Sequence, residues 1–195
     1  MASIVDICNL ALARLGDNAT VSSIDPPEGS AQAEHCQRFY PVALASLLEM
    51  HAWRFATTRQ TLAPLDITDA RWAFVYAAPS GMIRALGIML SGRGQPFEMR
   101  AIGGAQVILT DQEAAALDYV EQVTDTTRFS PLFVDALAWL LASYLAGPVL
   151  KGDAGAAMAK ACMQSFMLVV SLARASDAGQ QEIAPEHTPG WIGAR

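Results

Sequence analysis

The chain has 195 residues, 52% of them hydrophobic and 16% charged, which excludes disorder throughout, because so apolar a chain buries enough surface to offset its conformational entropy. Its 13 Lys and Arg against 19 Asp and Glu give a formal net charge of −6 and argue against a generic duplex-binding protein, which needs clustered basic side chains. The three cysteines, Cys8, Cys36 and Cys162, are far apart and lack zinc spacing, so we interpret them as buried apolar residues of a protein made in a reducing cytoplasm.

The N-terminal part is predicted to be helical. Ser3 followed by Asp6 is typical of a capping box, and the apolar spacing after it predicts a short amphipathic helix. The prolines and glycine within 22–29 predict a loop, since proline lacks the amide hydrogen that a helix needs. Helical spacing returns from about Ser30 to about Thr58, with Pro41 marking a kink or a break.

The middle of the chain changes to short runs of strand-like composition, separated by turns that contain Gly and Pro. This alternation predicts a small antiparallel β unit. The five predicted strands are 72–76, 83–90, 97–101, 106–110 and 118–123.

Two long apolar helices are predicted next. Ser130 and Pro131 suit the N-cap and the first position of a helix that runs to about Leu150. A second helix over about 154–175 should pack against it as an antiparallel hairpin. Residues 133–150 are also long enough to span a bilayer. Charged residues near the helix ends and on the second helix favour a buried hairpin, and a membrane hairpin stays as the alternative.

The last segment, 176–195, is rich in Gly and Pro, which predicts an extended tail. Ile183, Trp191 and Ile192 stand there among polar residues with no core of their own. Apolar side chains in such a setting are typical of a tail that docks onto another surface. We therefore interpret these three residues as docking anchors.

Together these elements predict a mainly α protein in a single domain. An antiparallel helical bundle, about 2–62 and 130–175, would carry a small antiparallel β unit inserted between its N-terminal and C-terminal helices, about 72–123. The extended C-terminal tail would be 176–195.

No motif predicts a catalytic, cofactor or metal site. His35, His51 and His187 lack the spacing of metal ligands, and no Ser or Cys stands in an activating context. We expect the aromatic side chains between the second helix and the first strand to pack the helices onto the sheet, since no basic groove accompanies them for stacking on bases. These aromatic residues are Trp53, Phe55, Trp72, Phe74 and Tyr76.

The most distinctive motif in the sequence is Leu47–Ala56, a leucine-rich helical segment that ends in Trp53-Arg54-Phe55-Ala56. Other characteristic runs keep a fixed order, namely Ile7–Gly16, Ser22–Ile24, Ala33–Cys36 with Tyr40, Trp72–Tyr76 with Pro79 and Arg84, Tyr119, Phe129–Phe133 and Ala136–Ala138. From about Ile4 to about Leu150, the chain resembles the head-to-tail adaptor proteins of tailed phages, the tail tubular protein A family. Ala52 and Arg54 stand where that family's motif has Pro and Asn. The structural motif residues by this resemblance are Trp53, Phe55, Ala56, Trp72, Tyr76, Pro79 and Pro131.

The resemblance implies a non-enzymatic virion protein at the head–tail junction, made in the cytoplasm of a bacterial host. Such a protein is a monomer when free, binds the portal protein as a dodecameric ring and extends the channel through which double-stranded DNA passes without specific binding. It also receives a downstream tail or nozzle protein. Ile183, Trp191 and Ile192 would then contact the portal or a neighbouring subunit. No cofactor, metal or membrane is implied.

Three other classes of protein stay open from the residues themselves. A membrane-associated helical hairpin protein would use the long apolar helices, and a soluble helical interaction module would use them to bind an unknown partner. A small lytic hydrolase is the weakest of the three, because no motif supports it.

Overall fold

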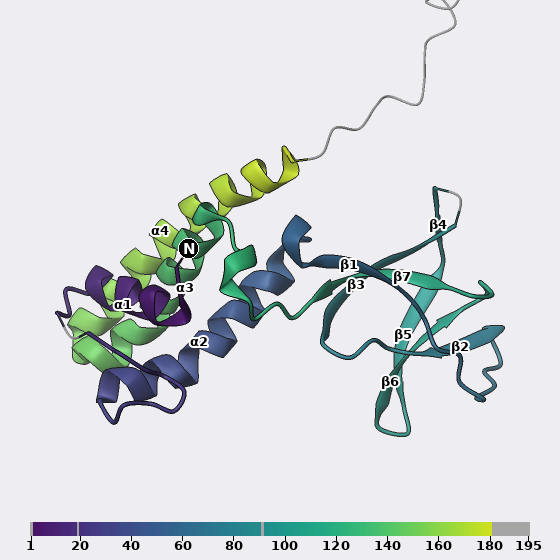
Figure 1. The fold of residues 1–195 in the computed structure, drawn as a ribbon, viewed down its shortest axis with the longest axis horizontal. Helices are drawn as coiled ribbons and strands as arrows, with labels where there is room; N and C mark the ends of the chain where they lie inside the picture. The colour runs from purple at the N-terminus through teal and green to yellow at the C-terminus, as the bar shows by residue number, and fades with distance from the viewer. Residues whose placement is uncertain (1, 19, 91, 181–195) are drawn as a thin grey trace, which may run out of the picture.

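Helices gather at one end of the molecule and strands at the other (Figure 1). The computed structural model describes residues 2–18, 20–90 and 92–180. In these residues, four α-helices and short 3-10 turns account for 47% and two antiparallel sheets for 24%. The prediction of a mainly α bundle with one small β unit is therefore wrong, and the fold is mixed α/β.

Two of the strands in the described residues, β1 and β4, were not predicted from the sequence. β1, Thr57–Thr61, has no apolar alternation and lies where the second helix was expected to end. β4, Arg93–Gln95, lies in a predicted turn. Each is extended because a distant partner pairs with it, β7 for β1 and β3 for β4. The five predicted strands are all present, as β2 Phe74–Ala77, β3 Met82–Leu90, β5 Phe97–Ile102, β6 Ala105–Thr110 and β7 Ala116–Glu121.

The helix starts follow the predicted caps. In α1, Ile4–Arg14, the Ser3 hydroxyl accepts from the Asp6 backbone N–H at 3.1 Å, and the Asp6 carboxylate accepts from the Ser3 N–H at 2.8 Å. In α3, Pro131–Leu150, the Ser130 hydroxyl accepts from the N–H of the third helical residue at 3.2 Å.

The bounds of the other two helices differ from the prediction, since α2 ends at Met50 and not near Thr58. α2 runs unbroken over Ala31–Met50 with Pro41 inside it, so of the predicted kink or break the break is absent. α4, Gly152–Ala178, extends beyond residue 175, where the tail was expected to begin.

α3 lies at the centre of the helical end and packs against α1, α2 and α4. α4 folds back on α3 as the predicted antiparallel hairpin. The Arg14 guanidinium of α1 pairs with the Asp135 carboxylate of α3 and lies 4.1 Å from the ring centroid of Trp139. Cys8, Cys36 and Cys162 are buried in this core, as predicted.

The strands form one sheet of order β1-β7-β3-β4 and a second of order β2-β6-β5. β1 and β3 lie nearest to the helices (Figure 1). Val120 at the end of β7 belongs to the helical core, so the four-stranded sheet and the helices share buried surface. A second, smaller core lies in the β part and contains Leu62, Tyr76, Ile88, Ile108, Ala115, Leu117 and Tyr119.

Candidate functional site

A cluster of four aromatic rings joins the helices to the four-stranded sheet; we call it the junction cluster, and it consists of Trp53, Phe55, Phe129 and Phe133. The Trp53 and Phe133 rings meet edge to face, with centroids 5.0 Å apart. Phe55 and Phe129 each lie within 4.8 Å of Phe133, centroid to centroid. Trp53 is 1% exposed, and its indole N–H donates to the Leu47 carbonyl at 2.8 Å. The cluster therefore combines edge-to-face ring contacts with a satisfied buried polar group.

The motif residues divide between this cluster and the β part. Trp53 and Phe55 pack the helices onto the sheet as predicted, Ala56 is fully buried beside them, and Pro131 is the first residue of α3. Trp72, Phe74 and Tyr76 pack within the β part instead, so the expectation that all five aromatic residues pack the helices onto the sheet is wrong for these three. The remaining motif residues have distinct places in the β part: Trp72 donates its indole N–H to Glu98 at 3.0 Å, Tyr76 donates its hydroxyl to the Gln112 carbonyl at 2.9 Å, and Pro79 precedes β3.

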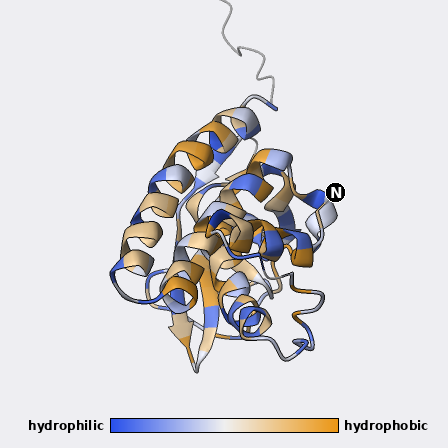
Figure 2. Cartoon of the chain, turned by 90° about the vertical axis from the view of Figure 1, so that its left-hand side faces the viewer, coloured by the Kyte–Doolittle hydropathy of each residue, from blue (hydrophilic) through white to orange (hydrophobic). Residues whose placement is uncertain are grey.

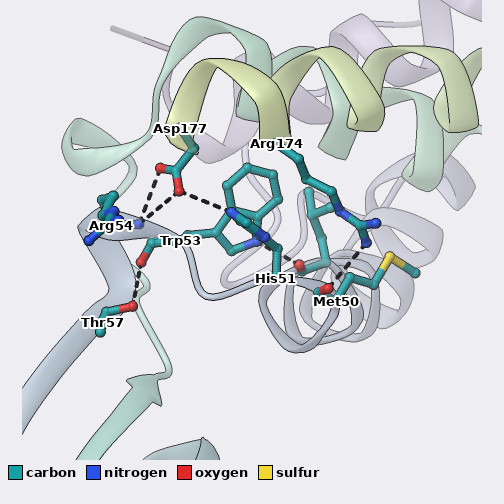
Figure 3. A network of polar contacts seen from close by, with 8 residues as sticks. Met50, His51, Trp53, Arg54, Thr57, Arg174 and Asp177 are labelled. Carbon is teal, nitrogen blue, oxygen red and sulfur yellow. Dashed lines mark hydrogen bonds and ion pairs between the residues drawn. The ribbon is translucent and has the colours of Figure 1, made fainter. Parts of the chain in front are cut away.

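Asp177, at the end of α4, ties that helix to the junction (Figure 3). Its side chain is almost fully buried, at 7% exposure for the residue. The Arg54 backbone N–H donates to both carboxylate oxygens, at 3.1 and 3.2 Å, and His51 Nε2 lies 3.1 Å from one of them. One turn earlier, the Arg174 guanidinium donates to the Met50 carbonyl at 3.2 Å. The last turn of α4 is thus part of the junction.

Asp177 is not among the predicted functional residues, because the composition of 176–195 predicts that residue 177 belongs to the tail. A signal was present: Phe166, Val170, Ala173 and Asp177 keep helical spacing, and all four are buried. A single acidic residue at the end of an apolar stripe is easily mistaken for the polar start of a loop.

The outer face of α4 is apolar and exposed (Figure 2). Met167, Leu168 and Leu172 are 57%, 71% and 60% exposed. From Ala161 to Ala173 the helix carries no charged side chain. Exposed apolar surface without charge is typical of a surface that contacts another molecule.

α3 and α4 are also, among the described residues, the two helices long and apolar enough to cross a membrane. In α3, more than half of the apolar stretch is buried within the protein, whereas in α4 only 22% of the apolar stretch is buried. The central position of α3 accounts for its apolar composition without a bilayer. Burial within the protein does not explain the apolar composition of the exposed face of α4.

The described residues offer no group of three or more His, Cys, Asp and Glu side chains that could hold a metal ion. Cys8 is fully buried, and its thiol pKa is raised, chiefly by the hydrogen bond with Cys36 and then by burial. A protonated, enclosed thiol is not poised for nucleophilic attack. The apolar face of α4 is a surface suited to binding another molecule.

The predicted anchors Ile183, Trp191 and Ile192 lie outside the described residues. The sequence matches no protein-family model, and no curated protein matches it significantly. What the chain does is therefore to be inferred from its motifs and from the geometry of the described residues.

Proposed function

We propose that this chain is a structural virion protein, the head-to-tail adaptor of a tailed phage. It binds the portal protein as a ring, extends the DNA channel and provides the docking platform for the next tail component. The observation that carries the proposal is the Trp53-Arg54-Phe55-Ala56 run and its place at the junction. This run and Phe133, far apart in the sequence, meet where the helical end joins the sheets, with the Phe55 and Phe133 ring centroids 4.8 Å apart.

The elongated arrangement supports an adaptor, because such a protein contacts different partners through different surfaces. The helical end presents the apolar face of α4, and the opposite end presents the β part (Figure 1). The two ends share one buried core, to which Trp53 of the junction and Val120 of β7 both belong. Partners bound at the two ends would therefore keep a fixed spacing.

Assembly from monomer to ring requires a surface that can stay exposed to water in the monomer and whose burial in the ring lowers the free energy. The Met167, Leu168 and Leu172 face of α4 has this character. The net charge of −6 fits a channel that must let DNA pass without retaining it.

Electron microscopy of negatively stained particles tests the proposal. The purified chain is mixed with the portal protein of the same genome and compared with each protein alone. We expect portal rings to gain a further tier with matching rotational symmetry. Portal rings that stay unchanged beside a well-folded chain would contradict the adaptor function.

The tail anchors are tested with the same complex. Trp191→Ala should weaken portal binding by about 2 kcal/mol or more, roughly thirty-fold in Kd, if Trp191 is a buried anchor. Truncation after Gln180 should abolish binding and leave the fold intact. Removal of 176–195, the tail as predicted from the sequence, is unsuitable because it also deletes Asp177 and so disturbs the junction.

The exposed face of α4 favours one alternative, a membrane-associated hairpin. In that case the chain should float with phospholipid vesicles, and Leu168→Lys should release it. An adaptor should stay in the unbound fraction without detergent. α3 would have to leave the core to enter a bilayer, since Phe133, Leu137 and Leu141 are fully buried.

A further inference from the structure

The outer face of α4 is left open by the other described residues, and the helix lies along the margin of the helical end (Figure 2). α3 is the element against which α4 packs, and Cys162, Phe166 and Val170 of α4 belong to the helical core. On the outer face, Leu168 is 71% exposed, the highest value of any large apolar side chain in the described residues. A face of this kind is typical of a surface that another molecule covers.

The spacing of residues on this face indicates which kind of molecule covers it. At 3.6 residues per turn, Leu168 and Ala175 lie about 200° and 180° around the helix axis from the buried Phe166. They belong to a row of exposed, uncharged positions separated alternately by four and three residues. We call this row the outer seam, and it consists of Ala157, Ala161, Gln164, Leu168, Ser171 and Ala175. Spacing by four and three residues is the pattern with which one helix packs along another, so the outer seam favours a helix as its partner.

The outer seam is complementary to itself. About a centre at the level of Phe166, two larger side chains lie inside and small side chains lie outside in both directions. The facing pairs of two antiparallel copies would be Ala157 with Ala175, Ala161 with Ser171, and Gln164 with Leu168. A twofold interface requires this kind of match, because each contact occurs twice with the roles of the two copies exchanged. Small side chains also let two helix axes approach closely, which brings the flanking Met167 and Leu172 nearer to the partner.

The helix dipole favours the antiparallel arrangement over the parallel one. Antiparallel helices set the positive N-terminal end of each beside the negative C-terminal end of the other, whereas parallel helices set like ends together. The outer seam itself carries no charge that would repel a second copy.

The area of such a contact is that of a weak dimer. α4 has 27 residues. It is therefore about 40 Å long, and a contact strip about 12 Å wide covers about 500 Å² on each copy, or about 1,000 Å² on both. Specific interfaces begin near this size, and stable ones bury about 1,200–2,000 Å². A second copy therefore suits the face, with a dissociation constant on the order of 100 µM.

We propose that two copies of the free chain pair through the outer seams of α4, antiparallel, about a twofold axis at the level of Phe166. The pair forms at high concentration and comes apart on dilution. It does not depend on the proposed adaptor function. If that function holds, the pair covers the face of α4 that a ring would use, so the two copies must separate before the ring forms.

Engineered cysteine pairs on the full chain test the arrangement. Ala161→Cys in one copy and Ser171→Cys in a second, tagged copy lie at the same height in the antiparallel pair, so mild oxidation should join them. Two Ala161→Cys copies should not join, because their Cα atoms differ by about 15 Å in height and a disulfide spans less than about 7 Å. The matched control is Ala156→Cys with Ser176→Cys, two exposed positions at mirrored heights that lie about 100° around the helix from the outer seam. We expect the mixed disulfide of positions 161 and 171 at least about ten-fold above both of these combinations.

Two results of this experiment would overturn the arrangement. Disulfides between two Ala161→Cys copies without the mixed product would mean that the helices are parallel. Equal yields from the seam pair and the control pair would mean that the copies meet by random collision.

Sedimentation equilibrium at about 10 µM to 1 mM measures the pair without added cysteines. Leu168→Glu should raise the dissociation constant at least about ten-fold, because the pair would bury two unpaired carboxylates. Met99→Glu, at an exposed apolar position in the β part, should change it by less than about two-fold. Circular dichroism checks that both variants fold. Equal effects of the two substitutions would place the contact elsewhere and refute the pairing.

Other occupants of the face give different results in the same assay. A chain that stays monomeric throughout but pairs after truncation at Gln180 would assign the face to residues 181–195. A chain that stays monomeric and binds phospholipid vesicles would assign it to a membrane. Either result overturns the proposal. No portal protein is present, so failure of the pairing and failure of the proposed adaptor function are distinguishable.

Discussion

Gly155 lies where α4 begins to pack on the end of α3, and replacing it with alanine should destabilise the protein. A Cβ at this position would lie 2.9 Å from the Ala146 carbonyl oxygen and 3.3 Å from the Cα of Gly147. Both are backbone atoms of α3, so no rotation of a side chain can relieve the contact. The two helices would have to move apart by a few tenths of an ångström.

Two opposing free energies set the magnitude. Overpacking of a close contact costs about 1–3 kcal/mol. Glycine to alanine within a helix contributes up to about 1 kcal/mol in the other direction. We therefore expect Gly155→Ala to lower the free energy of unfolding by about 1 kcal/mol.

Urea unfolding followed by circular dichroism measures this change. Ala156→Gly is the matched control, because Ala156 is the exposed neighbour of Gly155 in the same turn. The Ala156→Gly variant measures how helix propensity alone changes the free energy of unfolding, since Ala156 is exposed. If Gly155→Ala stabilised the protein by as much as Ala156→Gly destabilised it, the close contact between α3 and α4 would be refuted.

Three further predictions concern the junction and the first helix. Asp177→Ala should lower the free energy of unfolding by about 1–3 kcal/mol, because the partly buried Arg54 N–H loses its acceptor. Asp177→Asn keeps an acceptor oxygen and should cost less, and equal losses in urea unfolding would contradict this account. Trp53→Ala should lower the free energy of unfolding by about 3–5 kcal/mol in the same assay, and Trp53→Phe should lower it clearly less. A loss under about 1 kcal/mol for the alanine variant would mean that the junction cluster does not hold the two ends together. Hydrogen bonds from Ser3 hold the pKa of Asp6 below its ordinary 3.8, so its stabilising effect is complete above that value and is lost as the pH falls through the lowered pKa. Carbon-detected NMR titration should show this midpoint and a partial rise toward 3.8 in Ser3→Ala, which removes the hydroxyl but keeps the Ser3 backbone N–H, the larger cause. An unchanged midpoint would exclude the Ser3 hydroxyl as a cause.

Much of the local structure was predictable from the sequence because its causes are local. The Ser3 and Asp6 cap, the Ser130 and Pro131 start and the α3–α4 hairpin depend on residues a few positions apart. The five alternating strands were predictable for the same reason, since turn residues bound each of them. The burial of Trp53 and Phe55 at the junction also followed from their position between helix and strand.

The tertiary structure alone decided features that depend on distant partners. Thr57–Thr61 is a strand because β7 pairs with it and because Asp118 accepts from the Arg59 guanidinium at 2.6 and 2.7 Å, not because of its composition. Asp177 belongs to a helix and not to the tail because the Arg54 N–H and His51 meet its carboxylate there. The fold is mixed α/β and not mainly α because its strands form two sheets, and the pairings that add β1 and β4 to one of them depend on residues that no local window contains.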